Sequence, residues 1–152
     1  MRSPAYAGLA ALAVLACGTE PVELAAGYTL ASVDGGTPPQ LVGATVECDI
    51  SVVGGRVTFG TIAQQPAPDD YFELGLDVLT DCSRAGGSTS EATYGYTGTV
   101  EVDQRRVVFH TAGAGGGPLD LEGVLTVTGQ LETTVPLLVP LTDELSVSFA
   151  PN

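Results

Sequence analysis

The sequence predicts an all-β domain in which about eight antiparallel strands follow one another along residues 27–152. Apolar and polar residues alternate with a period of two in one stretch after another, as expected of strands with one buried face. Clusters of Gly, Pro, Asp and Ser separate these stretches. No stretch after Ala26 has a helical period of useful length, which excludes a mixed α and β class.

The first half of the domain contains the clearest alternation. Residues 28–33 form the first expected strand and end at a turn signal that begins with Asp34. Along residues 41–53 every second residue is apolar, which predicts a half-buried strand. Gly54-Gly55 is a two-residue hairpin signal, so residues 56–64 are expected to form a returning strand.

The second half repeats the pattern. Residues 71–81 place Phe72, Leu74, Leu76 and Val78 on one face, and a loop rich in Gly and Ser follows at residues 83–90. Further strands are expected at residues 93–103, 107–111, 119–128 and 145–150, with residues 130–138 forming another strand or an extension of the one before.

Short antiparallel strands joined mostly in sequence favour an up-and-down barrel. Closing the sheet removes the exposed edges that invite aggregation. A two-sheet β-sandwich has the same periodicity and is the competing architecture.

The N-terminus has the features of an export signal. Arg2 precedes an apolar run over residues 5–16, which matches a secretory signal and is too short to cross a bilayer as a helix. The run ends in Val14-Leu15-Ala16 followed by Cys17. An ordinary secreted protein with an incidental Cys17 is the alternative.

These four residues resemble the lipobox of bacterial lipoproteins. The resemblance implies that residues 1–16 are a signal peptide and that Cys17 becomes the N-terminus, bearing fatty acyl chains such as palmitate. Residues 17–26 are then a lipidated tether, and residues 27–152 form the domain. Gly18 is not the aspartate that retains such proteins at the inner membrane, so in a cell with two membranes the resemblance implies the outer membrane.

The domain itself resembles small lipocalin-like bacterial lipoproteins. The resemblance rests on an opening Gly-Tyr-Thr-Leu at residues 27–30, a Tyr-Gly-Tyr-Thr-Gly strand at residues 94–98, Cys82 at a strand end, and the terminal Leu-Ser-Val-Ser-Phe at residues 145–149. The chain has no tryptophan and so lacks the Gly-x-Trp motif of true lipocalins. A lipocalin-type ligand is therefore not carried over.

With Cys17 assigned to lipid through this resemblance, Cys48 and Cys82 form an even pair in an oxidising compartment. A disulfide is the expected state, and two buried thiols are the alternative. In a simple meander of the expected strands, the two cysteines lie two strands apart, about 9–10 Å, which is beyond disulfide reach. Either Cys82 folds over beyond its strand end, or the two faces meet across the core.

The charge balance limits the possible partners. The chain has a formal net charge of −13 and no lysine, and only four arginines follow residue 16. Such a surface repels nucleic-acid phosphates and anionic lipid, so we expect no nucleic-acid binding and attachment to the membrane by lipid alone.

No catalytic, metal or cofactor signature is present in the sequence. His110 is the one histidine, and no nucleophile motif accompanies it. The glycine-rich residues 113–117 lack the lysine of a phosphate-binding loop, and the acidic residues lack calcium-loop spacing. We therefore expect no enzymatic activity, no cofactor and no metal.

Two functions follow from these observations. In the first, the lipid-anchored barrel binds a small apolar or amphipathic ligand, with Tyr94 and Tyr96 as candidate lining residues; core packing is the alternative role of both rings. In the second, the barrel is filled and serves as a structural or protein-interaction module of the cell envelope. An eight-stranded barrel allows either outcome.

Overall fold

A computed structural model describes residues 23–62, 65–112, 118–136 and 144–152. Within these residues the secondary structure is β, apart from one short 3-10 turn, η1. The elements, in chain order, are β1 (Gly27–Val33), β2 (Gln40–Ala44), β3 (Asp49–Phe59), β4 (Thr61–Ile62), β5 (Gln65–Pro66), β6 (Tyr71–Asp81), η1 (Ser83–Ala85), β7 (Thr89–Asp103), β8 (Arg106–Ala112), β9 (Pro118–Leu125), β10 (Leu131–Val135) and β11 (Leu145–Pro151).

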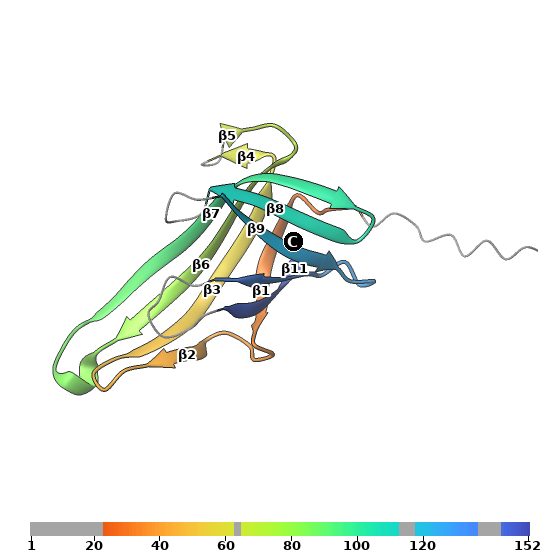
Figure 1. Ribbon diagram of the computed structural model, residues 1–152. Helices are drawn as coiled ribbons and strands as arrows, with labels where there is room; N and C mark the ends of the chain where they lie inside the picture. Colours follow the sequence, from red (N-terminus) through yellow and green to blue (C-terminus); the bar gives the residue numbers. More distant parts are fainter. Residues whose placement is uncertain (1–22, 63–64, 113–117, 137–143) are drawn as a thin grey trace, which may run out of the picture.

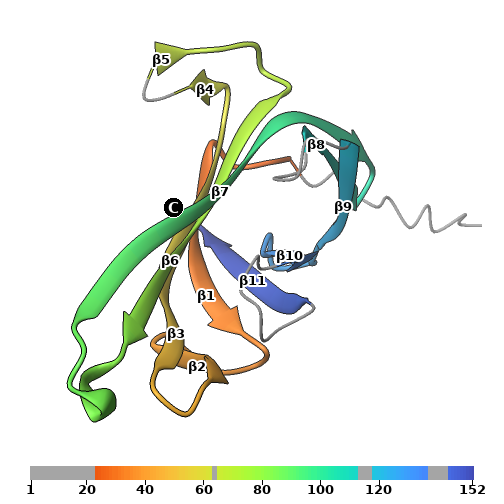
Figure 2. The same cartoon turned by 60° about the vertical axis from the view of Figure 1, so that its left-hand side comes forward.

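The main sheet closes on itself as an eight-stranded antiparallel barrel (Figures 1 and 2). Its strands follow the order β1-β11-β10-β9-β8-β7-β6-β3, and β3 pairs with β1 to complete the circle. Apart from β2, β4 and β5, each strand lies beside its neighbour in sequence, and β11 returns to β1. The predicted all-β, up-and-down barrel is confirmed, and the closure excludes the two-sheet sandwich.

The barrel interior is packed with side chains of the chain itself. Tyr28, Phe72, Phe109 and Phe149 are at most 1% exposed. Phe109 lies at the centre of this packing, because its ring centroid is 4.8 Å from that of Phe72 and 6.3 Å from that of Phe59. These rings occupy the volume between opposite walls, as expected for a barrel just wide enough to be filled by side chains.

Three strands extend beyond the closed part of the barrel as an arm (Figure 1). The arm comprises residues 49–55 of β3, 73–81 of β6 and 89–97 of β7, together with β2, which pairs only with β3. It exists because β1 pairs with residues 56–58 of β3 and β8 with residues 98–103 of β7, which leaves the other ends of these long strands outside the circle.

The predicted hairpin at Gly54-Gly55 is wrong. β3 runs straight through both glycines, which pair with Asp77 and Leu76 of β6. Gly55 faces inward, where a Cβ atom would lie 2.8 Å from the carbonyl oxygen of Gly75. The glycines therefore allow close approach and a β-bulge at residue 53 instead of a turn.

The turn between β2 and β3 instead lies at residues 45–48. The Thr45 hydroxyl accepts hydrogen bonds from the backbone N–H groups of Glu47, at 3.2 Å, and Cys48, at 2.8 Å. A threonine side chain that bonds the backbone two or three residues later stabilises such a turn. The predicted strand at residues 41–53 is thus two strands joined by a tight turn.

Gly98 marks the point at which β7 leaves the barrel wall. It pairs with Phe72 of β6 on one side and with Thr111 of β8 on the other, and β8 pairs with no residue of β7 before it. A Cβ atom at Gly98 would overlap the carbonyl oxygen of His110. The backbones of β7 and β8 are therefore closer here than any other residue type permits.

Gly98→Ala is expected to lower the free energy of unfolding by about 2–4 kcal/mol, because the backbone of β8 must shift to admit the methyl group. Gly95→Ala is the matched control in the same strand, since its Cβ would meet the nearest atom, the Leu74 carbonyl oxygen, at an ordinary 3.7 Å. Urea unfolding of both variants measures the difference. Equal stability of the two would contradict the close approach at Gly98.

Candidate functional site

The predicted lipidation site, Cys17, lies outside the described residues, as do the signal peptide and most of the tether. Among residues 23–62, 65–112, 118–136 and 144–152, no helix is long and apolar enough to span a membrane. The glycine-rich residues 113–117 also lie outside the described part.

Cys48 and Cys82 lie at disulfide distance at the tip of the arm. Their Sγ atoms are 2.02 Å apart and their Cα atoms 4.0 Å apart. Cys48 immediately precedes β3 and Cys82 immediately follows β6, and Asp49 and Asp81 beside them are paired across these two strands. The expected separation of two strands was wrong, because it assumed the hairpin at Gly54-Gly55; without that hairpin β3 and β6 are neighbours.

The disulfide and its surroundings fix the tip. A bond between residues 34 apart in sequence contributes about 3–4 kcal/mol on the chain-entropy estimate. Arg84 in η1 forms an ion pair with Asp49 across the tip. The backbone N–H of Ser83, followed by the Ser83 hydroxyl, lowers the pKa of Asp81, so this carboxylate is ionised at neutral pH.

Tyr94 and Tyr96, the predicted lining residues, both face the inner side of β7. Tyr96 is 5% exposed and its hydroxyl donates a hydrogen bond to the carbonyl oxygen of Pro136, which follows β10. Burial raises the pKa of this phenol. Tyr94 is half-buried and packs against the same core. The Tyr96 hydroxyl thus ties β7 to the opposite wall of the barrel.

His110 lies on the outer face of β8 between two acidic side chains. Its Nδ1 is 2.9 Å from Asp120 on β9, and its Nε2 is 3.6 Å from Glu101 on β7. The hydrogen bond with Asp120 is the main cause that raises the pKa of His110, and Glu101 adds to it. Both ring nitrogens face carboxylates, an arrangement that stabilises the imidazolium form rather than activating a hydroxyl nucleophile.

Elsewhere the acidic residues are dispersed. Among the residues that the structure describes, no three His, Cys, Asp or Glu side chains converge as a metal site would require. Asp49 of β3 lies opposite Asp81 of β6, but Asp49 is paired with Arg84, and Glu47 is exposed in the turn before β3.

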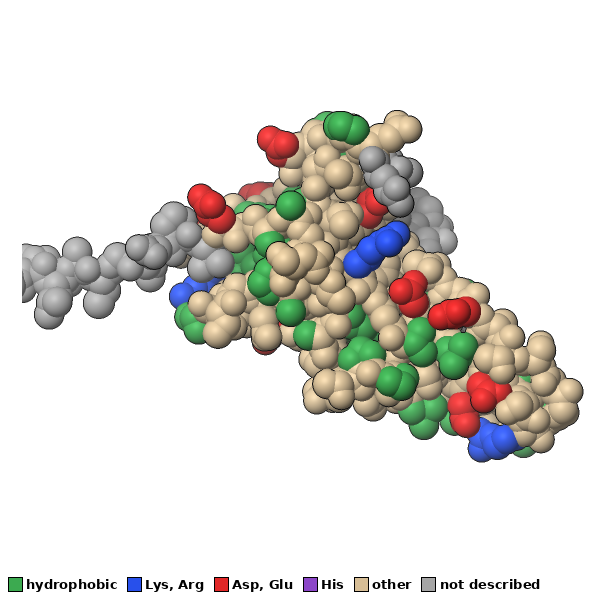
Figure 3. Space-filling view, turned by 180° about the vertical axis from the view of Figure 1, so that it is seen from behind, with side chains coloured by type: hydrophobic (Ala, Val, Ile, Leu, Met, Phe, Trp, Pro, Cys, Tyr) green, Lys and Arg blue, Asp and Glu red, His purple; other side chains and the backbone are tan. Residues whose placement is uncertain are grey.

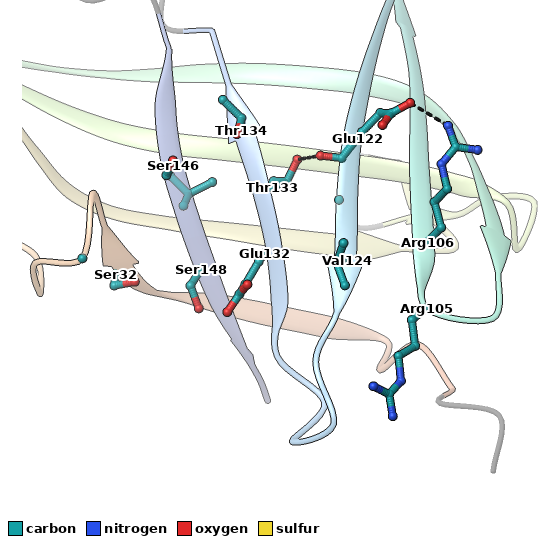
Figure 4. Close-up of a pocket in the computed structure, with 13 residues that line it drawn as sticks. Ser32, Arg105, Arg106, Glu122, Val124, Glu132, Thr133, Thr134, Ser146 and Ser148 are labelled. Atoms are coloured by element: carbon teal, nitrogen blue, oxygen red, sulfur yellow. Dashed lines mark hydrogen bonds and ion pairs between the residues drawn. The ribbon is translucent and has the colours of Figure 1, made fainter. Parts of the chain in front are cut away.

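An open groove with a volume of about 600 Å³ lies on the outside of the barrel (Figure 4). It crosses β1, β11, β10 and β9 and ends at Arg105, in the turn between β7 and β8, and at Arg106, the first residue of β8. We call it the outer groove. It faces away from the packed interior, so a molecule in it would remain in contact with solvent.

Small side chains between larger ones account for the outer groove. Cross-strand pairing sets Ser32 beside Ser148, Ser148 beside Glu132, and Glu132 beside Val124. Ser146 and Thr134 are paired in the same way two residues further along these antiparallel strands. The serine side chains are short and form the floor of the groove. The longer side chains of Glu122 on β9 and Arg106 on β8 form one of its walls (Figure 4).

The lining of the outer groove combines apolar surface with polar groups. Arg106 is paired with Glu122 at 2.6 Å, and the Thr133 hydroxyl donates to the carbonyl oxygen of Glu122 at 2.8 Å. Within the described residues, the side chains of Glu132 and Arg105 form no hydrogen bond or ion pair. Hydroxyl groups, a carboxylate and a guanidinium together can bind an extended polar chain, but no group in the groove is positioned as a nucleophile with its base.

The sequence pattern did not reveal the outer groove. Ser146 and Ser148 alternate with buried Leu145, Val147 and Phe149 in the predicted last strand, so their outward direction follows from the sequence alone. The groove depends on which strands become neighbours, and above all on the return of β11 to β1. That pairing joins residues from opposite ends of the domain.

In comparisons with known proteins, no family model, no curated protein and no solved structure matches this chain.

The raised pKa of His110 predicts a pH-dependent contribution to stability. A group whose pKa is higher in the folded state stabilises the fold below its unfolded pKa, about 6.5, and loses this effect as the pH rises through the folded value. The melting temperature of the wild type should therefore exceed that of His110→Gln at about pH 5, and the two should converge at about pH 8.

An NMR titration of the single histidine measures the same effect directly, with a midpoint expected above the ordinary value in the wild type. Asp120→Asn is the control and should lower the midpoint, because it removes the principal hydrogen-bond acceptor. An unchanged midpoint in Asp120→Asn would contradict this assignment.

Proposed function

We propose that this chain is a lipid-anchored cell-envelope protein without enzymatic activity, whose filled barrel presents an outer surface to other envelope components. The observation that carries the proposal is the position of Phe109, which is fully buried between Phe72 and Phe59 where a lipocalin-like barrel would hold a ligand. The outer groove lies on the opposite face of the sheet and is open to solvent.

The lipid anchor is supported by the sequence around Cys17 and by the place at which the chain enters the domain. The carbonyl oxygen of Ala26 accepts a hydrogen bond from the Phe59 backbone at the end of β3 that is distant from the disulfide. A tether from residue 17 therefore joins the domain at the end of β3 opposite the tip of the arm. The strongly acidic composition is consistent with attachment by acyl chains, since anionic lipid repels such a surface.

Mass spectrometry of the protein purified from membranes should find Cys17 as the first residue, carrying acyl chains. Cys17→Ser should remove the acylation and release the protein from the detergent-extracted membrane fraction. An unmodified residue immediately before or after Cys17 at the N-terminus would refute the anchor.

The second candidate function is binding of a small apolar ligand inside the barrel. One substitution distinguishes it from the first. Phe109→Ala should lower the free energy of unfolding by about 3–5 kcal/mol, because a packed ring is replaced by a cavity. The wild type should show no saturable binding of a fluorescent fatty acid. One-to-one binding by the wild type, with little loss of stability in Phe109→Ala, would support the ligand-binding alternative.

A further inference from the structure

The long strand β7 has one edge without a partner. Residues 89–97 pair with β6 along their whole length, whereas β8 begins its pairing only at Gly98. In Figures 1 and 2 this part of β7 forms the outer margin of the arm. Within the part of the chain that the structure describes, no other strand pairs with it.

The direction of the backbone groups along this edge follows from one hydrogen bond. The Val100 N–H donates to the carbonyl oxygen of Asp70 on the β6 side, at 2.6 Å. In an antiparallel ladder the bonding direction alternates, and the pairing of β7 with β6 has no register shift. The odd-numbered residues from Thr89 to Thr97 therefore direct their N–H and C=O groups away from β6. Thr99 and the odd-numbered residues after it direct the same groups toward β8.

This edge lacks the features with which sheet proteins usually block pairing. Residues 89–97 contain no lysine, no proline and no bulge, and Glu91 is their one charged residue. The opposite edge of the arm, β2, is short and carries a register shift between Leu41 and Gly43. One edge of the arm is thus protected and the other presents a regular template about 30 Å long.

The side chains around the open edge indicate the chemistry of a partner strand. On the outer face, Glu91 of β7 pairs with Leu79 of β6 and lies diagonal to Asp77 and Asp81, and Asp77 accepts a hydrogen bond from the Thr93 hydroxyl at 2.7 Å. Figure 3 shows acidic side chains along this face of the arm. On the inner face the corresponding residues are Ser90, Ala92 and the half-buried Tyr94. An incoming strand would meet Glu91 and threonine side chains on the outer face, with the β6 carboxylates one strand further away, and small or aromatic groups on the inner face.

We propose that residues 89–97 of β7 bind an extended segment of a basic partner protein by strand addition, with Lys or Arg toward the outer face alternating with apolar residues toward the inner face. Main-chain hydrogen bonds would supply affinity, and the alternating side chains would supply specificity. A second copy of this chain fits the edge less well, because it would bring two acidic faces together and each chain has a net charge of −13. The inference rests on the proposed role of the outer surface and adds the class of partner.

The test uses the full chain in mild detergent and a labelled peptide of about nine residues in which Lys and Val alternate. Thr93→Pro removes one N–H at the centre of the open edge and leaves the bonds to β6, whereas Thr93→Ala keeps that N–H. Both variants lose the hydrogen bond to Asp77, so they form a matched pair. The wild type and Thr93→Ala should bind the peptide with similar affinity, and Thr93→Pro should bind it at least about tenfold more weakly.

Hydrogen exchange on the wild type gives the second readout. The odd-numbered amides at residues 89–97 should become protected when the peptide binds, while the even-numbered ones are protected beforehand by β6. A peptide N-methylated at every second residue tests the same ladder without changing the protein, and should not bind even if Thr93→Pro unfolds the arm.

Several outcomes would overturn the proposal: undiminished binding of the N-methylated peptide, equal binding of a peptide in which Glu replaces Lys, or equal binding by folded Thr93→Pro. A wild-type dimer in sedimentation that Thr93→Pro abolishes would assign the edge to a second copy instead. Because the probe is a synthetic peptide in solution, failure here is distinguishable from failure of the lipid anchor, which concerns Cys17 alone.

Discussion

The continuous pairing of β3 with β6 is the constraint on which most of this molecule depends. It extends from Asp49 and Asp81 at the arm tip to Phe59 and Phe72 in the barrel. One part of β3 also pairs with β1 and closes the barrel, and the other part pairs with β2 outside it. The same ladder brings Cys48 and Cys82 together. A strand that ended at Gly54-Gly55 would leave the barrel without closure and the cysteines without contact.

The class of fold could be predicted from the sequence because alternation and closure are general constraints. The predicted limits of β6, residues 71–81, coincide with the observed ones. Apolar and polar residues alternate without interruption over this stretch, and turn-forming residues on both sides fix where the strand begins and ends. The register of β3 could not be predicted, because two adjacent glycines are compatible with both a hairpin and a bulged strand. Only the close approach of Gly55 to Gly75 decides between them, and that contact joins residues distant in sequence.

The functional regions were less predictable than the fold because they depend on which strands become neighbours. The direction of the Tyr96 side chain followed from alternation, whereas its bond to Pro136 did not. The outer groove and the open edge of β7 are both rich in Ser, Thr, Gly and Glu, and their residues follow no motif spacing. Their significance arises from an arrangement in which the interior is filled and the outer surface carries the hollows and the unpaired backbone.

The two ends of β3 have a consequence for the geometry of the anchored protein. Ala26, where the tether joins the domain, is bonded to Phe59 at one end of the strand, and the disulfide lies at the other. A strand of this length spans about 35 Å. In the proposed anchored protein, the tether joins the domain at one end of this strand and the tip of the arm lies at the other. The disulfide would keep the most distant point of the protein from fraying.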